Sequence, residues 1–166
     1  MVGEEDVEKL TDETIRDGGV LALLYFDVHG SDAEQIKNML VDLIARITKA
    51  NGVVYVRGEI DEALKIEGEH ITSAEVSVLT KDFSSLVGVC LEYAPFGVEV
   101  LRPERIVLNL GEAQSLLLNV SQVSQEYAKF VLSKIMNAEE RKKFEENLKK
   151  RAELGKMLRE RQGERK

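Results

Sequence analysis

The sequence predicts an α+β domain in which a four-stranded antiparallel sheet carries two helices on one face. A long amphipathic helix and a charged helical tail are expected to follow it. Segments with alternating apolar residues, typical of strands, are interspersed with segments whose apolar residues recur at helical spacing. Their order is strand, helix, strand, strand, helix, strand. Hydrophobic residues make up 43% of the 166 residues, which is enough for a buried core.

The strands are predicted over residues 20–28, 53–64, 70–80 and 97–102. The first is apolar on both faces, which indicates a central strand covered on both sides. The second and third form a hairpin with residues 65–69 as its turn. The fourth is expected to be a short core strand. Alternation at Ile106, Leu108 and Leu110 allows a fifth strand after it.

The helices are predicted over residues 32–50 and 82–94. Ser31-Asp32-Ala33-Glu34 has the pattern of a capping box, with Ser31 as the cap, and Asn51-Gly52 is expected to end the first helix. Asp82 is expected to cap the second helix, which Pro95 and Gly97 terminate.

This βαββαβ order is that of the ferredoxin-like fold, in which both helices pack on one sheet face. Right-handed crossovers would place the first and third strands at the centre. We therefore expect an N-terminal arm over residues 1–19, a ferredoxin-like domain over 20–110 and a C-terminal helical extension over 111–166. The arm is weakly patterned, so a short helix and a loosely held segment are both compatible with it.

The C-terminal extension differs from the body in pattern and in charge. A wide apolar stripe predicts a helix over residues 111–136. Asn137 is expected to cap a last helix that reaches about residue 161. Residues 1–138 contain 12 basic and 23 acidic residues, a net charge of −11, whereas residues 139–166 contain 11 and 7, a net charge of +4. We expect the basic tail to dock on the acidic surface of its own oligomer.

The apolar surface exceeds what one βαββαβ core can bury. Leu21, Leu23, Tyr25 and Tyr55 are predicted on the sheet face that carries no core helix, and helix 111–136, from the same chain or a neighbour, is expected to cover them. This excess favours a homo-oligomer. Its predicted interface consists of Leu21, Leu23, Tyr25, Leu116, Val120, Val123, Tyr127, Phe130, Phe144 and Leu148.

No group of residues predicts catalysis, a metal or a cofactor. His29 and His70 have no partner at metal-ligand spacing. Cys90 lies on the apolar face of the second helix, where a thiol acts as a small hydrophobic group. The carboxylates near the hairpin are expected to form a solvated acidic edge; they are Glu59, Asp61, Glu62, Glu67 and Glu69.

Two short segments resemble known families. Asp27-Val28-His29-Gly30, after the first strand, resembles the D-x-x-G turn of ACT domains, which are ligand-sensing modules with this strand order. That resemblance implies a ligand site at Asp27, His29 and Gly30. Residues 91–103 are similar to the last helix-strand unit of the C-terminal subdomain in WYL-type regulators, which is also ferredoxin-like.

These patterns favour a non-enzymatic binding or assembly protein that acts as a homo-oligomer. An ACT-like small-ligand sensor is the first alternative. An RNA- or ribosome-associated factor that uses residues 139–166 is the second, although the acidic body opposes phosphate binding. The longest apolar run, residues 20–26, is too short to span a membrane. One cysteine and an acidic N-terminus favour a cytoplasmic location.

Overall fold

A computed structural model of the protein describes residues 3–135, 137, 139–140, 142–147, 149–150 and 153. The chain divides into two compact units, residues 1–117 and 118–166. In chain order, the elements are α1 (Glu4–Arg16), β1 (Val20–Gly30), α2 (Ala33–Ile47), β2 (Val53–Ile60), β3 (Leu64–Ile66), β4 (Glu69–Thr80), α3 (Phe83–Tyr93), β5 (Gly97–Arg102) and α4 (Leu110–Ile135).

The sheet is antiparallel throughout, with strand order β2-β4-β1-β5 and β3 paired to β4. β1 and β4 are therefore central, as predicted for the first and third main strands. In the register, Leu24 of β1 lies opposite Val76 on one side and Val98 on the other. The α+β class and the antiparallel sheet predicted from the sequence are confirmed.

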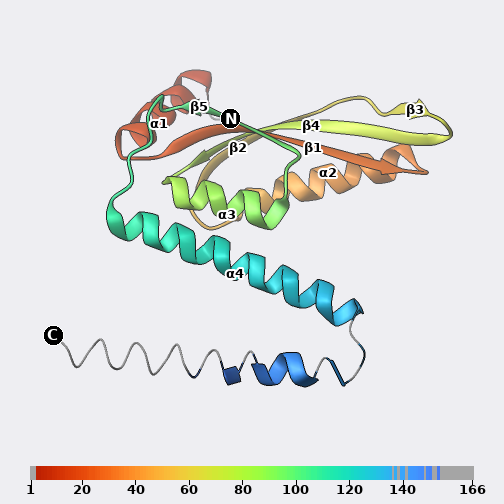
Figure 1. Cartoon of the computed structure of the whole chain (residues 1–166). Helices are drawn as coiled ribbons and strands as arrows, with labels where there is room; N and C mark the ends of the chain where they lie inside the picture. Colours follow the sequence, from red (N-terminus) through yellow and green to blue (C-terminus); the bar gives the residue numbers. More distant parts are fainter. Residues whose placement is uncertain are drawn as a thin grey trace. The chain divides into compact units, whose positions relative to one another are not determined.

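The core lies between one sheet face and the helices α2 and α3, which Figure 1 shows on the same side of the sheet. Every second residue of β1 from Val20 to Phe26 is buried in it, as β geometry requires. Asp82 caps α3 as predicted, and its carboxylate accepts a hydrogen bond from the Ser85 amide at 2.7 Å. The predicted cap of α2 is wrong by one residue. Asp32, not Ser31, accepts from the Gln35 amide at 2.8 Å.

The hairpin between β2 and β4 is tighter than predicted. Glu67 and Gly68 alone form its turn, with φ of 50° and 95°. Positive φ at both central residues is the geometry of a two-residue hairpin turn that matches strand twist. The predicted strand 53–64 breaks after Ile60, where the carbonyl of Asp61 accepts from the Thr72 hydroxyl at 2.8 Å. Residues 64–66 then form the separate strand β3.

β5 is an edge strand, which corrects the prediction of a core strand. Its apolar side chains Val98, Val100 and Leu101 are 42–48% exposed. The predicted fifth strand at residues 106–110 is absent from this described segment. Ile106 instead packs against the core from an irregular loop, so the alternation there reflects loop contacts and not pairing.

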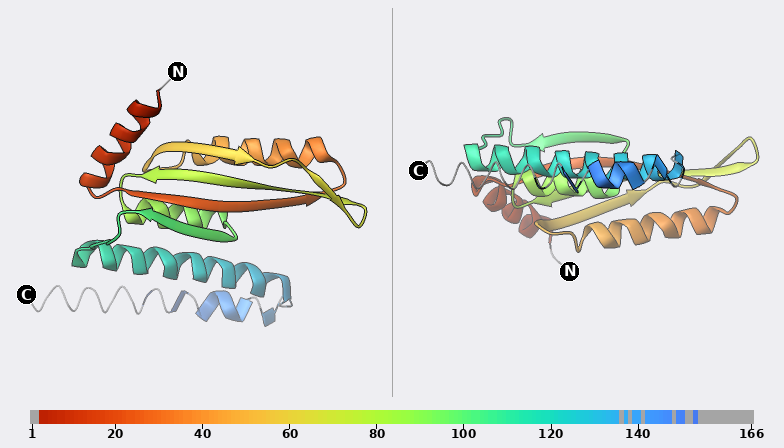
Figure 2. Two further views of the ribbon diagram at one scale, coloured as in Figure 1. Left: turned by 90° about the horizontal axis from the view of Figure 1, so that it is seen from above. Right: turned by 60° about the horizontal axis from the view of Figure 1, so that its bottom comes forward.

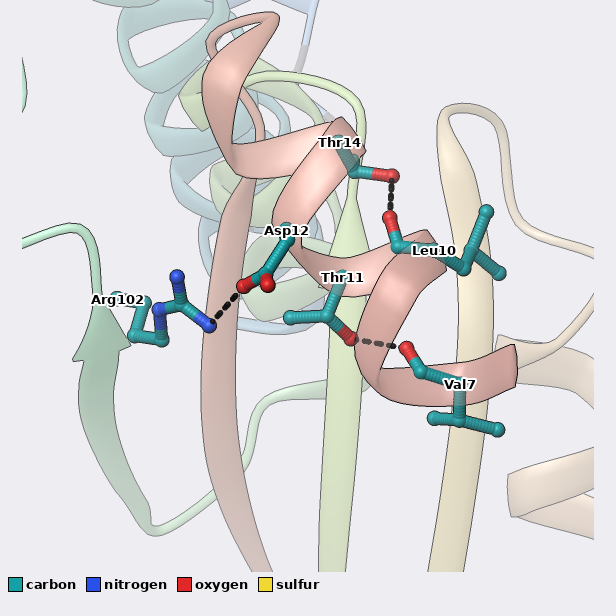
Figure 3. A network of polar contacts seen from close by, with 6 residues as sticks. All are labelled: Val7, Leu10, Thr11, Asp12, Thr14 and Arg102. Atoms are coloured by element: carbon teal, nitrogen blue, oxygen red, sulfur yellow. Dashed lines mark hydrogen bonds and ion pairs between the residues drawn. The ribbon is translucent and has the colours of Figure 1, made fainter. Parts of the chain in front are cut away.

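Residues 4–16 form a packed helix, which settles the alternative left open for the N-terminal arm. α1 contacts β1 and β4 at the end of the sheet where β1 begins, as Figure 2 shows. Thr11 is buried there, and its hydroxyl donates to the Val7 carbonyl at 2.8 Å. The Arg102 guanidinium lies 2.8 Å from the Asp12 carboxylate, and this ion pair joins α1 to β5 (Figure 3).

α4 begins at a reciprocal cap. The Asn109 side chain accepts from the Glu112 amide at 3.0 Å, and the Glu112 carboxylate accepts from the Asn109 amide at 2.8 Å. Asn137 caps the following residues as predicted, because its side chain accepts from the amides of Glu139 and Glu140. Residues 139–140, 142–147, 149–150 and 153 are helical, and the rest of the predicted tail helix lies outside the described residues.

Candidate functional site

The sheet face opposite α2 and α3 is only partly covered. Leu21, Leu23 and Tyr25 of β1 alternate with core residues and are half-buried, as is Tyr55 of β2. α1 packs over one end of this face, where Leu79 is fully buried. The sequence did not predict α1 as a cover. The predicted cover of Leu23 and Tyr25 by helix 111–136 stays a prediction.

A groove of about 560 Å³ runs between α1 and this face. Its floor contains Leu21, Tyr55 and Ser77, and its wall contains Val7 and Thr11. Glutamates of α1 and Arg57 line its rim, and the Arg57 guanidinium already lies 2.9 Å from the Glu59 carboxylate. Within the described residues, no buried side-chain nitrogen or oxygen lacks a hydrogen-bond partner. Burial therefore leaves no unsatisfied side-chain polar group of the described residues beneath the groove.

Beyond the groove, the face ends in an aromatic pair with an acidic border. The rings of Tyr25 and Phe96 lie 6.2 Å apart, and Phe96 is 67% exposed. The Tyr25 hydroxyl donates to the Glu99 carboxylate at 3.3 Å. Burial, followed by the negative charges of Glu99 and Glu75, raises the pKa of Tyr25. This end of the face is apolar and negatively charged, which disfavours nucleic acid as its partner.

The predicted ligand-binding turn has another structural explanation. His29 Nε2 lies 2.8 Å from Asp27 Oδ2, so these exposed side chains pair with each other. A Cβ on Gly30 would lie 2.6 Å from Ile36 Cγ2, so close packing against α2 accounts for the glycine. The structure brings Asp27 and His29 together and turns Gly30 toward the core.

The other polar candidates remain scattered. His70 Nδ1 lies 3.2 Å from the Ser31 carbonyl oxygen. Burial raises the pKa of the Cys90 thiol, which disfavours the reactive thiolate. A second hollow, of about 370 Å³, mixes Lys81 and Arg105 with three carboxylates. Among the described residues, no three His, Cys, Asp or Glu side chains are grouped to hold a metal ion.

α4 carries a series of exposed apolar side chains. Leu110, Leu117 and Ile135 are 76%, 69% and 77% exposed. They are spaced by close to whole turns of an α-helix, so they lie on one line along α4. Val120, Val123 and Tyr127, at 44%, 38% and 69% exposure, lie to one side of that line.

Four more residues of the predicted interface lie in this C-terminal part of the chain. Leu116 and Phe144 are half-buried. The ring of Phe130 is 61% exposed and lies 5.5 Å from the Lys134 ammonium. Leu148 lies outside the described residues.

These features define an antiparallel α+β domain followed by an amphipathic helix with exposed apolar side chains. The chain belongs to the MJ0538 family, whose family model matches residues 21–157. No curated protein and no solved structure matches the chain. In the part of the chain that the structure describes, no helix combines the length and apolarity needed to cross a membrane.

Proposed function

We propose that this protein is a binding or assembly protein that acts as a homo-oligomer through α4. The contact surface is the α4 stripe, defined as Leu110, Leu116, Leu117, Val120, Val123, Tyr127, Val131 and Ile135. The observation that carries the proposal is the exposure of Leu110, Leu117 and Ile135, each more than two-thirds accessible on one line of the helix. Large contiguous apolar patches on protein surfaces mark interaction sites.

The energetics support association through this stripe. Burying one large aliphatic side chain contributes about 1.5–3 kcal/mol of favourable free energy. Burial of several exposed side chains of α4 in one interface would therefore favour association. A helix with a wide apolar face owes most of its stability to packing against that face. The reciprocal cap at Asn109 fixes where α4 begins but supplies no burial.

The architecture proposed for the first unit is ferredoxin-like. The spatial order β5-β1-β4-β2 supports this assignment, as do two helices that cross over on one face. β3 then extends the hairpin before β4 and is not a separate layer. A cytoplasmic location is proposed because Cys90, the chain's one cysteine, has no second cysteine to pair with.

The two alternatives have weaker support. An ACT-like sensor would use Asp27, His29 and Gly30, but Asp27 pairs with His29 and Gly30 packs on Ile36. An RNA-associated factor would use residues 139–166, whose basic side chains alternate with acids. The Lys143 ammonium, for example, lies 4.0 Å from the Glu139 carboxylate. Such internal pairing reduces the positive charge available to phosphate.

The test is sedimentation equilibrium of the full chain, with two variants that each add one negative charge to α4. Leu117→Glu places the charge on the α4 stripe. Ser115→Glu places it on the opposite, exposed face and is the matched control. We expect self-association of the parent chain, loss of association in Leu117→Glu and no change in Ser115→Glu. A parent chain that stays monomeric at all concentrations, or equal association in both variants, would refute the proposal.

A further inference from the structure

We propose that α4 pairs in antiparallel orientation with α4 of a second copy of this chain, with Lys134 of each copy beside Glu112 of the other. This inference rests on the proposed function and adds the identity and direction of the partner helix. It draws on three features of α4, which are the spacing of its apolar residues, the size of its exposed side chains and the placement of its charges.

The spacing of the apolar residues on α4 suits a helix as the partner. Leu116, Val120, Val123 and Tyr127 follow one another at intervals of four, three and four residues. That is the repeat with which two α-helices interdigitate over a long seam. From Leu116 to Tyr127 the repeat covers about 17 Å of α4, which is about 39 Å long in all. A second α4 carries the same repeat and so matches this part of the surface.

The side-chain sizes fit an antiparallel register centred between residues 121 and 122. In this register Val120 lies opposite Val123 of the second copy, and Leu116 lies opposite its Tyr127. Val123 is 38% exposed and Tyr127 is 69% exposed, so both have surface to bury. Small residues then meet at the centre and larger ones outside it, which is the packing that fills an interhelical space without voids.

The charges distinguish the two orientations. Lys134 follows Tyr127 by seven residues and therefore continues the seam. In a parallel pair, Lys134 of one copy would face Lys134 of the other, and the two positive charges would repel each other. In the antiparallel pair it lies opposite Asn109 and within one turn of Glu112, because α4 has its acid in the first turn and its base in the last. The macrodipoles of the two helices are then also opposed, which is the favourable arrangement.

Charge variants test the orientation. Lys134→Glu and Glu112→Lys should each weaken self-association about tenfold, because each creates two like-charge contacts in the antiparallel pair. An equimolar mixture of the two variants should recover the parental affinity, since every contact between the two variants is then attractive. In a parallel pair, neither single variant would fall below the parent. Single variants as strongly associated as the parent would therefore overturn the proposal.

Spin-label distances measure the register directly in the full chain. Cys90→Ala removes the native thiol, and cysteines replace Ser121 or Gln114, both exposed and polar, in separate samples. In the proposed register, the two Ser121→Cys sites are nearly level, whereas the two Gln114→Cys sites are offset by about 23 Å along the helix. A longer distance between copies for Gln114→Cys is the expected result.

Sedimentation of the same labelled samples separates the possible failures. Equal short distances at both positions would mean a parallel pair and would overturn the proposal. An oligomer without any short distance at Ser121→Cys would also overturn it, while the proposed homo-oligomer would survive. A monomer in all samples would refute the proposed function and this inference together.

Discussion

α2 and α4 are both amphipathic helices with apolar residues at helical spacing, yet only α2 has its apolar face buried. α2 buries Ile36, Leu40 and Ile47 to 2% exposure or less against the sheet. α4 leaves Leu117 and Ile135 at 69% and 77% exposure. The comparison teaches that an apolar stripe predicts a buried face but does not identify what buries it. α2 finds its partner within the first unit, and we propose that α4 finds its partner in a second copy.

The largest expected effect is on the free energy of unfolding, which a leucine-to-alanine substitution should lower in α2 but not in α4. Leu40→Ala should lower the free energy of unfolding by about 2–5 kcal/mol, because it leaves a cavity where no water enters. Leu117→Ala should change it by less than about 0.5 kcal/mol at a protein concentration where the chain is monomeric. Urea unfolding at several protein concentrations measures both.

The dependence on protein concentration is the discriminating observation. The free energy of unfolding of Leu117→Ala should be lower than that of the parent only at high protein concentration, because the lost contacts lie between copies. A loss of several kcal/mol at every concentration would mean that α4 is buried within its own chain. The comparison between α2 and α4 would then fail.

The second prediction sharpens the role of the turn after β1. Gly30→Ala should destabilise the fold by about 1–3 kcal/mol, because the new Cβ would lie 2.6 Å from Ile36 Cγ2. The double variant with Ile36→Ala should show a favourable coupling, since that side chain is the obstacle. If the losses of the two single variants simply add in the double variant, packing against Ile36 does not explain Gly30. A role of Gly30 in ligand binding would then regain support.

The sequence predicted those elements whose signals are local. Asp82 as a cap, Asn137 as a cap and the alternation of β1 depend on neighbouring residues, and all are confirmed. The packing of α1 was not predictable in the same way. Val7, Leu10 and Ile15 allow one apolar side of a short helix, and all three are half-buried. The fully buried residue is the polar Thr11, whose hydroxyl donates to the Val7 carbonyl inside the helix, so the short apolar side left a loosely held arm equally compatible.

The errors have a common cause, which is that pairing partners are set by distant parts of the chain. β5 was expected in the core because Val98 and Val100 alternate, but it has only β1 beside it within the described residues. Of the candidate site, the sequence predicted the amphipathic helix α4, and its role as an interface stays a prediction. It could not identify the groove at α1, because that groove depends on the unrecognised packing of Thr11.

The third prediction compares the caps of the two helices. Asp32→Ala should lower the global free energy of unfolding by about 0.5–2 kcal/mol, because α2 unfolds with the core. Asn109→Ala removes a similar cap from α4 but should leave the global value nearly unchanged. Its effect should appear as faster hydrogen exchange of the amides of residues 110–113. A global loss equal to that of Asp32→Ala would show that α4 unfolds together with the sheet.

The smallest expected effect concerns the ion pair between α1 and β5. The Asp12 carboxylate and the Arg102 guanidinium lie 2.8 Å apart, but their side chains are 51% and 47% exposed (Figure 3). Water and salt screen such a pair, so a double-mutant cycle with Asp12→Asn and Arg102→Gln should give a coupling of only about 0.2–1 kcal/mol. The coupling should shrink further in 1 M salt, where the screening length falls to about 3 Å.

The Arg57–Glu59 pair within β2 is the matched control, because its side chains are 63% and 70% exposed and it joins no separate elements. Both cycles should therefore give similar small couplings if burial around Thr11, and not charge, attaches α1 to the sheet. A coupling above about 2 kcal/mol for Asp12–Arg102 alone would mean that the ion pair holds α1 in place. α1 would then differ from α2, whose attachment rests on buried apolar contacts.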